Sequence, residues 1–128
     1  MAQKKYDTTA EHFEYFKQRV DFWQKKLGAT CYSIFCVHEK DGKNTMASFQ
    51  KWDDIARIKI NLNLKTDVPP TTDELDVAAF HEVFEAIYLS TLRGLAKTSW
   101  SEYEVEQATH KAVAMATSSI FKTLRQSP

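Results

Sequence analysis

Three ionisable residues stand close together in the apolar segment 80–85, which reads FHEVFE. In a helix, His81 and Glu85 lie one turn apart on the same face, because residues four positions apart are neighbours there. Both side chains are metal-ligand types. Glu82 lies about 100° further round the helix, where the pattern H-E-x-x-H places its general base. The segment therefore predicts a metal centre in which Glu85 replaces the second histidine and Glu82 acts on a metal-bound water.

A third ligand has to come from another element, and the last predicted helix offers Glu102, Glu104, Glu106 and His110. If the two helices form an antiparallel hairpin around residues 94–99, Glu85 and His110 lie roughly 14 Å and 15 Å from the turn. They would then face each other and complete, with His81, a two-histidine, one-carboxylate set. That set is typical of catalytic zinc with an open fourth position, and it also suits Fe(II). Glu106, one turn nearer the hairpin turn, could be an alternative ligand or accept a hydrogen bond from His110.

Simpler interpretations of the same histidines exist. An H-E-x-x-E pattern arises by chance in many helices, and His81 and Glu85 could be a pair on an exposed surface. We favour the metal centre because ionisable groups are costly to bury in an otherwise apolar helix without a partner or an ion. His110 stands at the edge of an apolar arc and could be a partly exposed histidine. His12 and His38 are predicted to be surface residues.

Hydrophobic periodicity predicts a helix near the N-terminus. Its apolar residues recur at steps of three and four, which is one helical stripe: Phe13, Phe16, Val20, Trp23 and Leu27. Thr8 and Glu11 have the spacing of a capping box at its start, and Gly28 is placed to end it.

Three strands are predicted next. Residues 30–38 are apolar on both faces, which favours an inner strand. Asp41-Gly42 predicts a hairpin turn, followed by a strand over 45–52. Residues 57–64 alternate strictly between apolar and polar types, so we expect one buried face and one face in water.

Two helices complete the chain. Residues 65–72 resemble a linker, and a capping box at Thr71 and Glu74 opens a helix that should run to about Arg93 and end at Gly94. This helix is apolar almost all round, which predicts a central position. A third capping box, at Ser101 and Glu104, opens a helix to about Arg125. The expected fold is α+β, a single domain over 1–128, with a small, mostly antiparallel sheet covered by helices on one face.

Composition narrows the function classes. Lys and Arg total 17 and so do Asp and Glu, which gives no electrostatic reason to expect nucleic acid as the main partner. No apolar run approaches the ~20 residues that span a membrane, and no apolar segment follows the N-terminal lysines as in a secretory signal. We therefore expect a cytoplasmic protein in which Cys31 and Cys36 are free thiols.

Together these features resemble a known family, the small zincin-like metallopeptidases encoded by bacteriophages and prophages. Three segments, within about residues 30–125, carry the resemblance: AFHEVFE at 79–85, the polar-edged strand 57–64, and the acidic, histidine-bearing segment 101–113. The resemblance implies a minimal zincin-like fold and a bacterial host cytoplasm. It also implies a zinc-dependent peptidase with Zn²⁺ as cofactor and Fe²⁺ as the alternative.

The resemblance also implies roles for individual residues. His81, Glu85 and His110 would bind the metal, and Glu82 would be the general base. The strand 57–64 would be an edge strand that pairs with an extended peptide substrate. Many zincins carry histidine at the position of Glu85, and the chain offers only Tyr88, Tyr103 and Arg93 as candidates to stabilise an oxyanion. The alternative hypothesis is therefore a non-catalytic module that binds a protein partner on a degenerate zincin scaffold.

Overall fold

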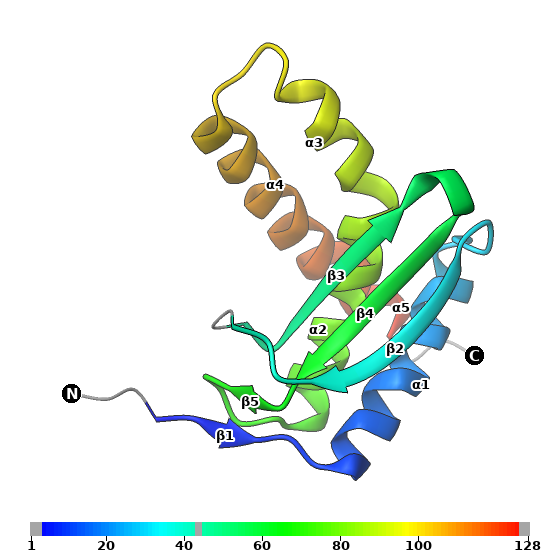
Figure 1. Ribbon diagram of the computed structural model, residues 1–128, viewed down its shortest axis with the longest axis vertical. Coiled ribbons are helices and arrows are strands. Elements are labelled where there is room, and N and C mark those ends of the chain that lie inside the picture. Colours follow the sequence, from blue (N-terminus) through cyan, green and yellow to red (C-terminus); the bar gives the residue numbers. More distant parts are fainter. Residues whose placement is uncertain (1–3, 43–44, 126–128) are drawn as a thin grey trace.

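Helices pack behind a three-stranded sheet, and a helical hairpin projects beyond it (Figure 1). The computed structural model describes residues 4–42 and 45–125. The sheet contains β2 (Ser33–Glu39), β3 (Ala47–Trp52) and β4 (Arg57–Asn63). The combination of one helical layer with this sheet confirms the α+β class.

The sheet is mixed, with strand order β2-β4-β3. The central strand β4 runs parallel to β2 and antiparallel to β3. The hairpin predicted at Asp41-Gly42 is wrong, because β2 and β3 each pair with β4 and not with each other. The expectation of a mostly antiparallel sheet is likewise not confirmed for these three strands. Lys43 and Asn44, between β2 and β3, lie outside the described residues.

Central and edge strands are exchanged relative to the sequence-based expectation. β2 was predicted to be an inner strand but lies at an edge, and β4, which the resemblance assigned to an edge, is paired on both sides. The alternation of apolar and polar residues in β4 predicted a polar face in water, but a polar side chain in a central strand can instead be buried. The Asn61 amide is buried and bonds to both the N–H and the C=O of Glu39, at 2.9 and 3.2 Å.

The first helix is α1 (Ala10–Lys26), and its N-cap is Thr9, one residue later than the predicted N-cap Thr8. The capping box is formed by Thr9 and His12, whereas the Thr8 hydroxyl donates to the carbonyl of Asn63 at 2.7 Å. The helix ends as expected, since Gly28 follows it with a φ of +70°. Two short strands that were not predicted from the sequence pair with each other. They are β1 (Tyr6–Asp7), which precedes α1, and β5 (Lys65–Thr66), which follows β4.

The second helical stretch is longer than expected. It comprises α2 (Thr72–Phe84), a π-helical segment (Glu85–Leu89) and α3 (Ser90–Ala96). Gly94 lies inside α3 and does not end it, so the predicted boundary is wrong.

A loop then leads to the last helical stretch. This consists of α4 (Glu102–Ala116), a second π-helical segment (Thr117–Phe121) and α5 (Lys122–Leu124). The N-caps Thr71 and Ser101, of α2 and α4, accept the predicted backbone hydrogen bonds.

The core lies between the helices and the sheet. Trp23 of α1 packs edge-on against Phe80 of α2, with ring centroids 4.9 Å apart, and lies 5.3 Å from Phe121. All three side chains are fully buried, so the central position predicted for α2 is confirmed. In the described part of the chain, no helix has the length and apolar character needed to cross a membrane.

Candidate metal centre

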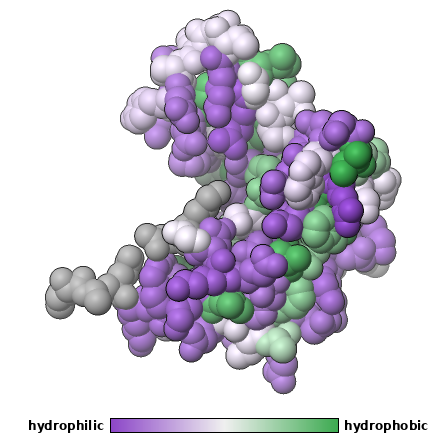
Figure 2. Space-filling view, viewed as in Figure 1, coloured by the Kyte–Doolittle hydropathy of each residue, from purple (hydrophilic) through white to green (hydrophobic). Residues whose placement is uncertain are grey.

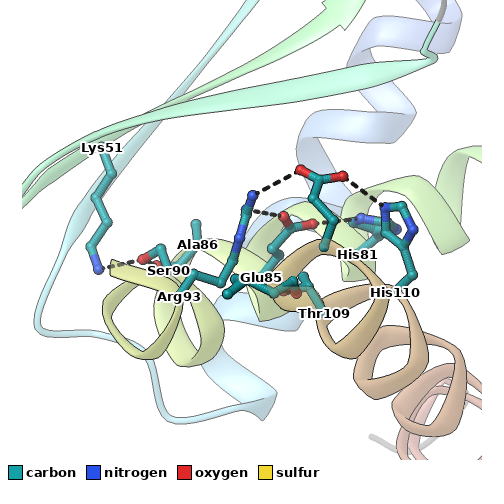
Figure 3. A network of polar contacts seen from close by, with 10 residues as sticks. Lys51, His81, Glu85, Ala86, Ser90, Arg93, Thr109 and His110 are labelled. Atoms are coloured by element: carbon teal, nitrogen blue, oxygen red, sulfur yellow. Dashed lines mark hydrogen bonds and ion pairs between the residues drawn. The ribbon is translucent and has the colours of Figure 1, made fainter. Parts of the chain in front are cut away.

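One polar network between two helical stretches contains five of the side chains singled out in the sequence (Figure 3). His81 Nε2 donates to Glu85 Oε2 at 2.7 Å, and Arg93 Nη1 donates to Glu85 Oε1 at 2.7 Å. The other guanidinium nitrogen, Nη2, lies 3.4 Å from Glu106 Oε1. Glu106 Oε2 is in turn 3.8 Å from His110 Nε2. The chain of contacts thus connects two histidines through two glutamates and one arginine.

The pair formed by His81 and Glu85 is electrostatically coupled. The hydrogen bond to Glu85 raises the pKa of His81 above its ordinary value and outweighs the lowering effect of burial. Burial by itself would raise the pKa of Glu85, but the bond from His81 and the charges of His81, Arg93 and His110 lower it. The pair therefore favours an imidazolium beside a carboxylate.

The π-helical segment places Arg93 beside Glu85. Eight residues separate them, which in a regular helix would turn Arg93 about 80° away from the direction of Glu85. A π-helical turn acts as one inserted residue and sets the following residues back by about 100°. The two side chains then point within about 20° of each other, two turns apart. Sequence periodicity assumes a regular helix, so it could not reveal this contact.

Glu106 and His110 contribute from α4, on the far side of Arg93. His110 is the most open member of the network, with 67% of its side chain exposed, whereas Glu85 has 15%. Glu106 was predicted to lie one turn away from the level of Glu85. Arg93 overcomes that offset, because its long side chain reaches carboxylates on both helices.

The remaining catalytic candidates fall in different places. Glu82 is buried on α2, and its charge helps to raise the pKa of His81. The Tyr88 hydroxyl donates to the carbonyl of Leu27, which directs it away from the network. Tyr103 is largely exposed. Of the three oxyanion candidates, Arg93 is the one that contacts the network among the residues the structure describes.

These donors fit a divalent ion in their chemistry, since imidazole nitrogen and carboxylate oxygen are ligands of both zinc and Fe(II). As placed, however, no three His, Cys, Asp or Glu side chains among residues 4–42 and 45–125 could hold one ion together. The Arg93 guanidinium takes the position between the two carboxylates. A metal ion would therefore compete with Arg93 for Glu85 and Glu106.

A second acidic residue of α2 was not singled out in the sequence. Asp76 is buried, and its Oδ1 accepts hydrogen bonds from Arg19 Nε at 2.7 Å and from Trp23 Nε1 at 2.8 Å. Arg125 Nη2 lies 3.8 Å from its other oxygen. This group joins α1, α2 and the end of the chain.

The other predicted surface and thiol residues are also placed. His12 and His38 are both half-buried, so the surface prediction for them is only partly right. His12 caps α1, and His38 stacks on Phe13 and contacts Thr8. Cys31 and Cys36 are free thiols, as predicted. Comparison with models of known protein families, with curated proteins and with solved structures finds no match to this chain.

Proposed function

We propose that the protein is a metal-dependent hydrolase in which His81, Glu85 and His110 bind a zinc ion. The observation that supports this most is that the network brings together, from two helices, two histidines and two glutamates that the sequence had separated by up to 29 positions. Such an excess of ligand-type side chains in a partly open position is typical of functional sites. The zincin-like resemblance of the sequence extends the proposal to peptide bonds in a cytoplasmic setting.

Each residue has a defined part in this proposal. A bound zinc ion would supply a Lewis acid that polarises the scissile carbonyl. Glu82 would take a proton from the attacking water and deliver it to the leaving amine. Glu106 would hold His110 in position or replace it as a ligand. Arg93 would release Glu85 when metal binds and keep its contact with Glu106.

Zinc titration tests the ligand set. The metal-free full chain is titrated by calorimetry, and we expect about one zinc ion per chain. His81→Ala, Glu85→Gln and His110→Ala should each weaken binding by at least about 100-fold. His12→Ala and Glu102→Gln are matched controls, because they remove the same residue types outside the network. Absence of zinc and Fe(II) binding by the wild-type chain would refute the proposed centre.

Glu82→Gln tests the chemistry separately from the metal. The amide keeps the size of the side chain but cannot act as a base, so zinc affinity should be retained. Turnover of a fluorogenic peptide mixture by the zinc-loaded protein should fall by about 10²–10⁴-fold. Equal turnover by the two proteins would remove Glu82 from this role.

A second candidate function is a non-catalytic module that binds a protein partner. The observation in its favour is that Arg93 already forms ion pairs with Glu85 and Glu106 within the chain. In that case the network is a structural ion pair between α3 and α4, and zinc should neither bind nor raise the melting temperature. The titration above therefore separates the two functions.

A further inference from the structure

An apolar groove runs between the two arms of the helical hairpin formed by α3 and α4. Its volume is about 470 Å³. The groove is lined mainly by leucine, alanine and tryptophan side chains, among them Leu89, Leu92, Ala96, Trp100, Ala108 and Ala112. Figure 2 shows the projecting hairpin at the top of the molecule, with hydrophobic surface beside hydrophilic surface.

Large apolar side chains of the hairpin face water. Leu92 and Trp100, which line the groove, are 61% and 62% exposed, and Leu95 and Tyr103, elsewhere on the hairpin, are 66% and 72% exposed. Single exposed apolar residues are ordinary, but several beside an apolar groove indicate a surface that binds another protein. The hairpin also projects away from the sheet (Figure 1), so a partner could reach it without meeting the rest of the chain.

Charges on the hairpin are segregated between its two arms. Residues 86–101 contain Arg93 and Lys97 and no acidic residue, whereas residues 102–106 contain three glutamates and no basic residue. Lys97 follows α3 directly and Glu102 opens α4, so these two charges lie at the tip. Lys97 and Glu102 form no ion pair within the described part of the chain. The tip therefore offers opposite charges that the chain itself leaves uncompensated.

We propose that the hairpin is the interface of a homodimer. Two copies related by a two-fold axis, with their tips at the same level, would place α3 of one against α4 of the other. Lys97 of each copy then lies opposite Glu104 of the other copy. Such a surface is complementary to itself, as a two-fold interface requires. The four helices would bury the exposed leucines and Trp100.

Sedimentation of the wild-type chain is the first test. A small interface should give a dissociation constant in the micromolar range, so the dimer should form between about 1 and 200 µM. Leu95→Ser should weaken association by at least tenfold while leaving the far-ultraviolet circular dichroism unchanged. Because the experiment uses neither metal nor substrate, its outcome is independent of the proposed hydrolase.

A charge exchange makes the test specific. Lys97→Glu places like charges opposite Glu104 of the second copy, and Glu104→Lys places like charges opposite Lys97, so each variant should dimerise more weakly than the wild type. An equimolar mixture should form a heterodimer, because opposite charges then face each other at both contacts between position 97 of one chain and position 104 of the other. Lys122→Glu, remote from the hairpin, is the matched control and should dimerise normally. A wild-type chain that stays monomeric to about 200 µM, or a mixture that does not associate, overturns the proposal.

Discussion

Helix α2 and its continuation carry two acidic side chains in contrasting settings. Asp76 has a 3% exposed carboxylate with one arginine and one tryptophan bonded to it. Nine residues later, Glu85 shares the guanidinium of Arg93 with a second acid, Glu106. The first group has one carboxylate and several donors, whereas the second has two carboxylates and two imidazoles around one cation.

Hydrogen-bond satisfaction separates the two groups further. Arg19 uses Nε and Nη2 on Asp76, and Nη2 also donates to the carbonyl of Arg125. Arg93 Nε is buried and has no partner, which is costly for a polar group. In a group that serves stability alone, every buried polar atom should have a hydrogen-bond partner and be shielded from water, as at Asp76. Two carboxylates that share one guanidinium, whose Nε has no partner, are more consistent with a site that exchanges partners.

The largest expected effect is at Asp76. Asp76→Ala removes one member of a buried ion pair and leaves Arg19 and Trp23 without their acceptor. We expect the free energy of unfolding to fall by about 3–5 kcal/mol, measured by urea denaturation. Zinc affinity of the protein that remains folded should not change.

The control for Asp76→Ala is a double variant that removes both charges of the buried ion pair. Replacing both partners, as in Arg19→Met with Asp76→Leu, should cost less than Asp76→Ala alone, because no unpaired charge stays buried. If Asp76→Ala lowers the free energy of unfolding by less than about 1 kcal/mol, the buried pair stabilises the fold no more than a surface salt bridge does.

Much of the fold could be predicted from periodicity and capping residues. The apolar stripe of α1, the N-caps Thr71 and Ser101, and the buried position of α2 all follow from local patterns. Strand order could not, because it depends on long-range pairing. Residues 57–64 alternate as an edge or a central strand would, and the role of Asn61 in binding the backbone of Glu39 is invisible before the strands are paired.

In the candidate site, too, contacts within one helical turn could be predicted from the sequence and contacts between distant residues could not. His81 and Glu85 could be predicted because their contact lies within one helical turn. The contact between Arg93 and Glu85 requires the π-helical segment, and that between Arg93 and Glu106 requires the hairpin. In regular helices His110 would lie opposite Glu85 at the same distance from the hairpin turn, and Arg93, eight positions after Glu85, would point away from it.

A smaller effect is expected at Arg93. If the guanidinium competes with metal for Glu85 and Glu106, Arg93→Met removes the competitor and should raise zinc affinity about tenfold. Calorimetric titration measures this against Lys97→Met, which removes a neighbouring positive charge outside the network. A drop in affinity would instead assign Arg93 to holding the carboxylates in place for the metal.

The smallest effect concerns pH and the pair of His81 and Glu85 in the metal-free protein. The pKa of His81 is raised above 6.5, so its contribution to stability is full below that value and is lost as pH rises through the folded-state pKa. The pKa of Glu85 is lowered from 4.5, so its contribution is present above that value and is lost as pH falls through the folded-state pKa. The pair should therefore stabilise most between these two ordinary values.

Nuclear magnetic resonance titration of the His81 ring protons checks this directly. Glu85→Gln removes the carboxylate that favours the imidazolium, so the pKa of His81 should fall, with burial then dominating. Glu102→Gln on α4 should leave it unchanged. The accompanying change in unfolding free energy should stay below about 1 kcal/mol, because His81 is partly exposed and water screens the pair. A His81 pKa that does not respond to Glu85→Gln would mean that the two side chains are not paired in solution, and the contrast with the closed group at Asp76 would then lose its basis.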